Sequence, residues 1–278
     1  MARQTLYERL DSLGVDVHYE YTALITLFKV EQSVIHAHRH YSLIGYVNNV
    51  YFRNLPSQFR APYLSVEEMM DALGIRDESE SLDDLFLLSE LLVALLPQKR
   101  TIENMDAFQQ AHTIIANILA FTEKLNYELY EIEKGREIIV AKNPATTQAV
   151  EIVEDLPTSL ALIEYNHYTL KGNLEEKRRI LTALGSYIEP ILRSRALQNA
   201  GYKQLESDVG FMLNSFHVRH NNKEGAKAQD YIIGLNAKQM EEWYDKIYNA
   251  ILSVIIINDH IPMQEKIAEL KSNYNWRK

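Results

Sequence analysis

The hydrophobic positions of this chain recur at helical spacing over most of its length. Residues 19–45, 85–96 and 102–125 carry apolar side chains three and four positions apart, which predicts long amphipathic helices. After a break at Asn143-Pro144 the pattern returns, and Asn236 with Gln239 has the spacing of a capping box. In this second half the pattern predicts helices over about Thr146–Val153, Thr158–Lys171, Leu174–Arg195, Tyr202–Val218 and Ala237–Asp259.

The hydrophobic period changes from helical to alternating around Lys134-Gly135. Glycine supplies the positive φ that a two-residue turn needs, so this dipeptide can join two strands. That register sets Glu133 opposite Arg136 and Leu129 opposite Val140. We therefore predict one β-hairpin at about residues 127–142 of an otherwise helical chain.

These elements define the expected organisation of the chain. The fold class is mainly α, a helical bundle with a single β-hairpin in the middle. We expect an N-terminal helical region at 1–98, a helix with the hairpin at 99–142, a helical bundle at 143–260 and a polar tail at 261–278. The last predicted helix is apolar over a wide arc, which favours a homodimer interface. The arc comprises Trp243, Tyr244, Ile247, Ile251, Ile255 and Ile256.

Composition narrows the class of protein further. The 278 residues include no Cys, which excludes disulfides and thiolate metal sites and fits a reducing cytoplasm. The longest apolar run, Ile251–Ile257, is too short for a membrane span, so we expect no membrane partner and a cytoplasmic location. The net charge of −9 argues against a generally cationic nucleic-acid binder.

One basic region stands out against this acidic background. Lys171–Lys227 holds ten Lys or Arg and six Asp or Glu, a net charge of +4 that leaves −13 for the rest. Without any binding function, such a region is interpreted as a solvated helix surface.

Metal binding has one candidate pair in the sequence. His36 and His40 lie one turn apart if residues 19–45 form one helix, which is the spacing of two helical metal ligands. No Glu follows His36, as the helix of a zinc protease requires, because Ala37 stands there. A partly exposed helix end that is rich in His and Tyr explains the pair without a metal, and we expect no metal and no cofactor.

The chemically richest stretch is Asp208–Gly225, which begins as an apolar helix and ends in polar residues. His217, Arg219, His220 and Asn221 follow the apolar face directly. Arg can hold a phosphate through two hydrogen bonds, His can exchange a proton near neutral pH, and Asn can orient the imidazole. This set suits metal-free cleavage of RNA, whose own 2′-OH can act as the nucleophile. Further candidates for RNA contact in the same region are Arg193, Arg195, Lys203, Asn214, Asn222 and Lys223.

The same residues have a purely structural interpretation. Arg219 and His220 can cap the end of the helix at 202–218, where cations are favoured. Asn221, Asn222 and Gly225 can then form the turn that follows.

The run LNSFHVRHNNKEG (213–225), with EEWYDKIYNAIL (241–252) after it, resembles the carboxy-terminal helical domain of bacterial abortive-infection (Abi-like) proteins. Those proteins resemble the HEPN superfamily of small helical-bundle ribonucleases. The resemblance covers about Asn143–His260. It implies a bundle of four to five helices, homodimerisation and the role of an RNA-cleaving toxin in phage defence. It also implies that the first 142 residues form a variable region for sensing or partner binding.

One departure from the family pattern divides the functional hypotheses. The catalytic motif of the superfamily is an Arg, a polar residue and a His several positions further on. Arg219 and His220 match its start, but residues 221–231 contain no His. Either His220 or His217 takes the acid–base role in a metal-independent endoribonuclease, or the domain is a non-catalytic binding module such as an antitoxin, sensor or assembly subunit.

Overall fold

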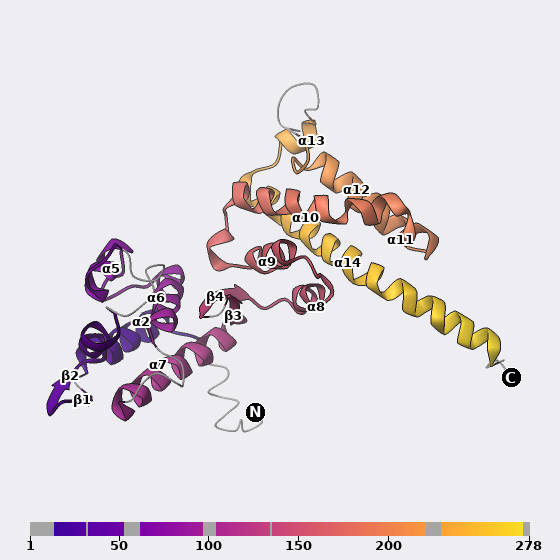
Figure 1. Ribbon diagram of the computed structural model, residues 1–278. Helices are drawn as coiled ribbons and strands as arrows, with labels where there is room; N and C mark the ends of the chain where they lie inside the picture. Colours follow the sequence, from indigo (N-terminus) through magenta and orange to yellow (C-terminus); the bar gives the residue numbers. More distant parts are fainter. Residues whose placement is uncertain are drawn as a thin grey trace, which may run out of the picture. The chain divides into compact units, whose positions relative to one another are not determined.

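The computed structural model describes residues 14–31, 33–52, 62–96, 104–133, 135–220 and 229–274. The chain divides into two compact units, Met1–Lys142 and Asn143–Lys278. Both units are mainly helical, and a β-hairpin ends the first of them (Figure 1). The predicted fold class is therefore confirmed.

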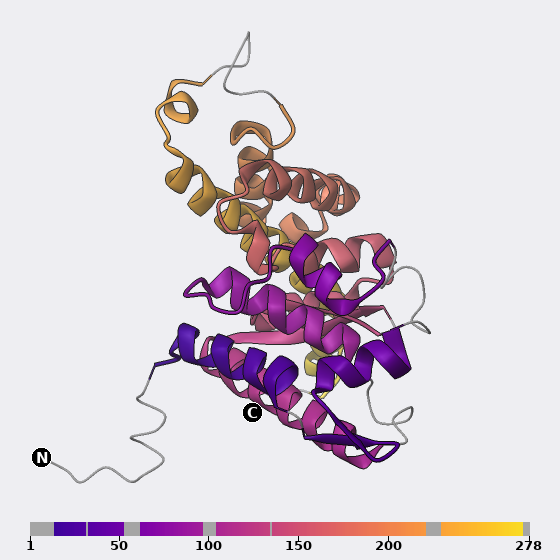
Figure 2. The ribbon, with the colours of Figure 1, turned by 90° about the vertical axis from the view of Figure 1, so that its left-hand side faces the viewer.

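The first unit is built around one strongly apolar helix. The unit comprises α2 (Val17–Ile25), the π-helix η1 (Thr26–Val30), β1 (Val34–His36), β2 (Arg39–Tyr41), α3 (Leu43–Tyr46), the π-helix η2 (Val47–Tyr51), α5 (Val66–Ala72), α6 (Leu82–Leu95), α7 (Met105–Lys124), β3 (Tyr127–Glu133) and β4 (Arg136–Ala141). Helix α6 buries Leu85, Phe86, Leu88, Leu92 and Leu95 in the core of the unit. Its neighbours are α2, α7 and the hairpin of β3 and β4 (Figure 2).

The β3–β4 hairpin lies where the alternating pattern predicts it. Glu133 pairs with Arg136 as expected, and Gly135 has the positive φ of 76° that the turn requires. The expected pairing of Leu129 with Val140 is wrong by one residue, because an irregularity between Glu131 and Glu133 shifts the register. Leu129 therefore lies opposite Ile139.

Strand β4 makes a specific contact with α6 at its outer edge. The backbone N–H of Ile139 donates a hydrogen bond of 2.7 Å to a carboxylate oxygen of Glu90. Phe86, from the same helix, contacts the ring of Tyr127 on β3 at a centroid distance of 4.7 Å. The apolar helix thus holds both strands of the ribbon.

A second, shorter hairpin replaces part of the long helix predicted over residues 19–45. Helix α2 ends at Ile25, and β1 and β2 pair antiparallel with His36 opposite Arg39 and Ile35 opposite His40. Because side chains alternate between the faces of a strand, His36 and His40 point to opposite faces of the ribbon. The one-turn spacing proposed for a metal site is therefore wrong. No group of three or more His, Asp or Glu within the described residues is placed to hold a metal ion.

The second unit is a helical bundle centred on its last helix. It comprises α8 (Pro144–Ile152), α9 (Leu156–Glu164), the 3-10 turn η4 (Tyr168–Leu170), α10 (Leu174–Ser194), α11 (Ala196–Asn199), α12 (Lys203–Ser215), α13 (Asp230–Ile233) and α14 (Ala237–Asn273). Helix α14 packs against α8, α10, α11 and α12. The helix predicted over Thr158–Lys171 ends earlier than expected, at Glu164, and η4 leads from it toward α10.

Helix α14 begins as predicted but does not end as predicted. Asn236 and Gln239 form the expected capping box. The helix passes through Pro262 and continues to Asn273, so the expected end at Asp259 is wrong. Its wide apolar arc is used within the unit, because four of its six residues, Tyr244, Ile247, Ile251 and Ile255, are buried in the bundle core. The width of the arc therefore gives no support for a homodimer.

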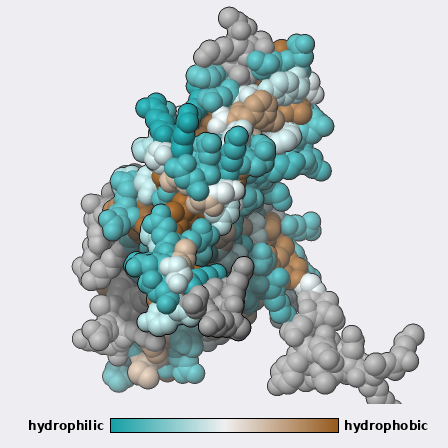
Figure 3. Space-filling view, turned by 90° about the vertical axis from the view of Figure 1, so that its right-hand side faces the viewer, coloured by the Kyte–Doolittle hydropathy of each residue, from teal (hydrophilic) through white to brown (hydrophobic). Residues whose placement is uncertain are grey.

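The surface shown in Figure 3 is largely hydrophilic, with hydrophobic residues gathered in small areas. Among the described residues, no helix combines the length and the apolar character that crossing a membrane requires.

Candidate functional site

The predicted catalytic residues lie in the segment Phe216–His220, which follows the end of α12. Phe216 caps the helix, and its N–H donates to the carbonyl of Met212 at 3.0 Å. His217 then adopts a left-handed conformation with φ 59°. The N–H of Arg219 donates to the carbonyl of Leu213 at 3.1 Å, so the chain folds back over the last turn of the helix. A left-handed residue is a usual way to end a helix, although Gly rather than His normally occupies it.

The Phe216–His220 segment is fixed to one face of α10. Arg178 Nε donates to the carbonyl of His217 at 2.5 Å, and Thr182 Oγ1 donates to the carbonyl of Val218 at 3.1 Å. Arg219 donates in the opposite direction, to the carbonyl of Gly185 at 2.9 Å. Positions 178, 182 and 185 are four and three residues apart, which places them on one face of the helix.

Gly185 lets α12 and Arg219 come close to α10. A Cβ at this position would lie 3.1 Å from Leu213 Cδ2 and 3.9 Å from Arg219 Nε. The absence of a side chain thus has a packing reason, because the fully buried Leu213 of α12 lies directly over Gly185.

The charge of Arg219 is offset inside the unit. Its guanidinium lies 3.8 Å from Glu189 on α10, and its side chain is 21% exposed. Glu189 also accepts a hydrogen bond of 2.5 Å from Arg193. The single carboxylate of Glu189 is shared between two arginines, so it compensates only part of their combined positive charge.

The remaining predicted site residues are only partly brought together. The side chains of His217 and His220 are half-buried in the same segment as Arg219. Asn214 is turned back on its own helix and donates to the carbonyl of Gly210. Asn221, Asn222 and Lys223 lie outside the described residues.

The other RNA-binding candidates lie away from this segment. Arg195 and Lys203 are exposed at the end of α10 and the start of α12. Helix α12 spans 13 residues, so Lys203 is separated from Arg219 by roughly 18 Å of helix at 1.5 Å per residue. The structure therefore does not assemble all the predicted residues into one cleft.

An open depression on the surface of α10 borders the Phe216–His220 segment. It has a volume of about 500 Å³ and is lined by Asn173, Glu175, Glu176, Arg178, Arg179 and Thr182. Two carboxylates balance its two arginines, and Arg179 is bonded to Glu176 at 2.5 Å. Its charges largely cancel, which gives it little attraction for an anion.

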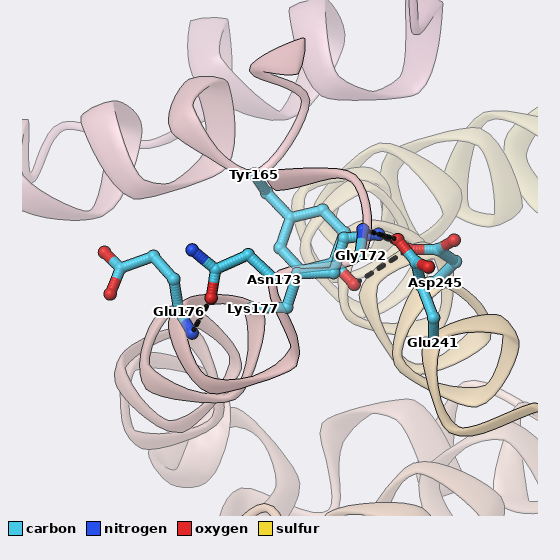
Figure 4. Close-up of polar contacts among 7 residues, drawn as sticks. All are labelled: Tyr165, Gly172, Asn173, Glu176, Lys177, Glu241 and Asp245. Atoms are coloured by element: carbon cyan, nitrogen blue, oxygen red, sulfur yellow. Dashed lines mark hydrogen bonds and ion pairs between the residues drawn. The ribbon is translucent and has the colours of Figure 1, made fainter. Parts of the chain in front are cut away.

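A buried charge cluster that the sequence did not reveal centres on Lys177 of α10. The residue is 6% exposed. Its ammonium lies 2.8 Å from Glu241 and 2.7 Å from Asp245, one turn apart on α14 (Figure 4). Tyr165 donates its hydroxyl to Asp245 at 3.0 Å, and the N–H of Gly172 donates to Glu241 at 2.7 Å. The cluster thus joins the end of α9 and the start of α10 to α14.

The tyrosines beside this cluster are neutral at physiological pH. Burial and the neighbouring Asp245 raise the pKa of Tyr165 far above its usual value of 10. Its ring stacks on Tyr248 at a centroid distance of 4.0 Å. The Tyr248 hydroxyl donates to the carbonyl of Leu162 and accepts from Asn166, and burial raises its pKa as well. This polar network is satisfied by hydrogen bonds, as buried polar groups require.

The pKa of Glu241 is lowered although the residue is partly buried. Burial alone would raise the pKa, but the N–H of Gly172 and the ammonium of Lys177 favour the carboxylate and outweigh it. The Glu241 carboxylate therefore stays ionised beside the Lys177 ammonium. A charged lysine between two carboxylates has no lone pair to act as a base or nucleophile, so the arrangement is suited to holding helices together.

The sequence carried one weak signal of this cluster. Glu241 and Asp245 are four residues apart on a predicted helix and hence on one face of it. Their partner Lys177 is more than 60 residues away in the chain. Periodicity cannot identify such a contact.

Comparison with known proteins gave no match to a family model, a curated protein or a solved structure. The likeness to Abi-like and HEPN proteins therefore rests on the residues of the 213–225 and 241–252 runs alone.

Proposed function

We propose that the Asn143–Lys278 unit is a non-catalytic helical binding module with an HEPN-like organisation, in a protein of the phage-defence type. The observation that supports it most is the direction of Arg219. Its guanidinium donates to the carbonyl of Gly185 and faces Glu189, both on α10. An arginine that binds a scissile phosphate needs its donors directed toward the substrate. Arg219 instead fastens the end of α12 to α10.

The neighbouring cations support the same proposal. Arg178 binds the carbonyl of His217, and Arg193 binds Glu189. Arg178 thus joins α10 to the Phe216–His220 segment, whereas Arg193 pairs with a residue of its own helix. The Arg178 contact agrees with a structural role for this part of the basic region.

RNA is the partner that we propose for this module. Arg195 and Lys203 are exposed, and they belong to the one region of the chain with a positive net charge. Contacts of such cations with phosphates carry no base specificity and weaken with salt. A protein partner would contact the first unit, through residues 1–98.

A metal-independent endoribonuclease is the second candidate. One observation favours it: His217, Arg219 and His220 come from a single five-residue segment, and their side chains keep partial exposure. An imidazole that titrates near neutral pH can act as a general acid or base toward a bound phosphodiester. In the related enzymes that the resemblance suggests, a homodimer would bring two such segments together.

A comparison of Arg219→Ala with Arg195→Ala tests the proposal. Loss of the hydrogen bond and ion pair of Arg219 should lower the free energy of unfolding by about 1–3 kcal/mol. Arg195 is exposed, so its replacement should leave stability unchanged and weaken RNA binding. Stability is measured by urea unfolding and binding by fluorescence anisotropy with a labelled single-stranded RNA, over a range of salt concentrations.

An RNA cleavage assay distinguishes the binding module from the ribonuclease. The same RNA is incubated with the wild-type chain in EDTA and examined on a denaturing gel, and the chain is also expressed in bacteria to measure growth. Intact RNA and normal growth support the binding module. Cleavage that Arg219→Ala abolishes without lowering stability would refute it in favour of the ribonuclease.

A further inference from the structure

We propose that the open depression at the start of α10 binds a guanine base, and that this base is an unpaired guanine of the RNA. The inference rests on the proposed RNA binding of the unit and names the part of the RNA that is recognised. The depression has a volume of about 500 Å³, within the range of roughly 300–1,000 Å³ that small-ligand sites occupy. Exposed cations such as Arg195 bind phosphates without reading sequence, so recognition of a base needs a separate site.

The depression offers hydrogen bonds to a neutral ligand rather than to an anion. Two arginines and two glutamates line it, so their charges cancel. Arg179 and Glu176 are bonded to each other at 2.5 and 2.8 Å. Arg178 and Glu175 also line the depression, but no ion pair joins them within the described part of the chain. These two side chains are therefore the charged groups that a ligand can use.

Arg178 supplies a pair of donors in a fixed orientation. Its Nε donates to the carbonyl of His217 at 2.5 Å, and the residue is half-buried. The side chain makes no other hydrogen bond among the residues that the structure describes, so both Nη groups remain for a ligand. Because one edge of the guanidinium is already bonded, the side chain loses little conformational freedom when a ligand binds.

Glu175 supplies two acceptors beside these donors. It is exposed in the first turn of α10, where Asn173 caps the helix by accepting from the N–H of Glu176 at 3.2 Å (Figure 4). Within the described residues the Glu175 carboxylate has no hydrogen-bond partner. A separation of three residues places Glu175 and Arg178 on the same face of the helix. This face therefore carries a pair of acceptors next to a pair of donors.

Guanine is the base whose edges match both pairs. Its O6 and N7 accept two hydrogen bonds on one edge, and an arginine is their usual partner. Its N1–H and N2–H donate two on the neighbouring edge, where a carboxylate can accept them. Adenine places a donor beside N7, which repels the second donor of Arg178, and uracil and cytosine offer Glu175 only one donor atom. The guanidinium of Arg179, held by Glu176, offers a plane on which the base can stack.

Base substitution in the RNA tests the site on the wild-type chain. A short labelled oligouridylate with one guanine is compared by fluorescence anisotropy with strands that carry adenine, 7-deazaguanine or inosine in its place. 7-Deazaguanine lacks the N7 acceptor, and inosine lacks the N2 donor. We expect guanine to bind about tenfold more tightly than adenine, with both analogues in between. Equal affinity for guanine and adenine would overturn the proposal.

Variants of the two side chains assign the contacts. Glu175→Ala should remove the preference for guanine over inosine and keep the preference over 7-deazaguanine. Glu151→Ala removes the same charge from an exposed position on α8 and should keep both preferences. Arg178→Lys keeps the charge without the paired donors, so it should remove the preference over 7-deazaguanine, and its melting curve shows whether the unit stays folded. A Glu175→Ala chain that prefers guanine to inosine as strongly as the wild type does would refute the site.

Failure of this site and failure of the proposed function give different results. Arg195→Ala should weaken the binding of every strand equally and leave the preference for guanine unchanged. RNA binding without any preference among the bases would remove the guanine site and leave the RNA-binding module in place. Binding of guanosine monophosphate without binding of RNA would assign the depression to a free nucleotide and refute the RNA-binding module.

Discussion

Replacement of Lys177 by Met tests whether the buried charge cluster holds the second unit together. Methionine keeps most of the side-chain length and removes the charge, which leaves Glu241 and Asp245 without their cation. Removing one partner of a buried ion pair costs about 3–5 kcal/mol when the other partner stays buried and unpaired.

The exposure of the two carboxylates sets the expected size of the effect. The Asp245 side chain is 48% exposed and keeps its hydrogen bond from Tyr165, so water can replace much of what Lys177 supplies. Glu241 is 20% exposed and keeps the N–H of Gly172 as its remaining donor. We therefore expect a loss of about 2–3 kcal/mol, below the full cost of a buried unpaired charge.

Tryptophan fluorescence during urea unfolding is the suitable assay. Trp243 stacks on Phe216 and packs against the core of the second unit, so its fluorescence reports the unfolding of that unit. Lys238→Met on the exposed start of α14 is the matched control and should change stability by less than about 0.5 kcal/mol. The double variant Lys177→Met/Glu241→Gln should recover part of the loss, because the uncompensated charge is gone.

Two results would refute this reasoning. The first is a Lys177→Met variant as stable as the Lys238→Met control. The second is a double variant less stable than Lys177→Met alone, since that would mean Glu241 stabilises the unit through contacts other than the ion pair.

Further predictions concern glycines and pH. Gly185→Val should lower the free energy of unfolding by about 1–3 kcal/mol, because the new side chain overpacks against Leu213. Gly210→Ala should raise it by about 0.5–1 kcal/mol, because a Cβ at this helical position meets open space. Urea unfolding measures both effects. Because the pKa of Glu241 is lowered, its contribution is complete above the unfolded value near 4.5 and is lost as pH falls below it, so Glu241→Gln should flatten the acid limb of a stability–pH curve. Because the pKa of Tyr165 is raised, stability should fall as pH rises above about 10, where only the unfolded chain ionises, and Tyr165→Phe should remove that part of the decline.

Local sequence signals predicted those parts of the fold that local interactions determine. The capping box of Asn236 and Gln239 begins α14 where expected, and Gly135 sits in the turn of the predicted hairpin. Both features depend on residues a few positions apart, which a sequence shows directly. The end of α14 was missed because Pro262 and polar residues argued for a stop, although the helix passes through them.

Contacts between distant residues account for most of what was missed. The β1–β2 hairpin lies in a stretch whose apolar positions also fit a helix, and its first strand is held by α7, where Asn104 at the helix start donates to the carbonyl of Ile35. The sequence predicts that Arg219 lies at the end of a helix, but it does not predict where its side chain points. That direction depends on Gly185 and Glu189, some 30 residues earlier. The structural interpretation of Arg219 was available from the sequence, but only packing against α10 could distinguish it from the catalytic one.

The contact of Glu90 with Ile139 has a consequence for the behaviour of the hairpin in solution. A two-stranded ribbon has two edges, and each exposes backbone amides that can pair with a strand of another molecule. The outward amide of Ile139 is already bonded to a carboxylate held on α6. An incoming strand would have to displace this carboxylate from the amide of Ile139. Glu90 thereby occupies the outward amide at the middle of β4, so the side chain that fastens the hairpin to α6 also opposes pairing with another strand at this position.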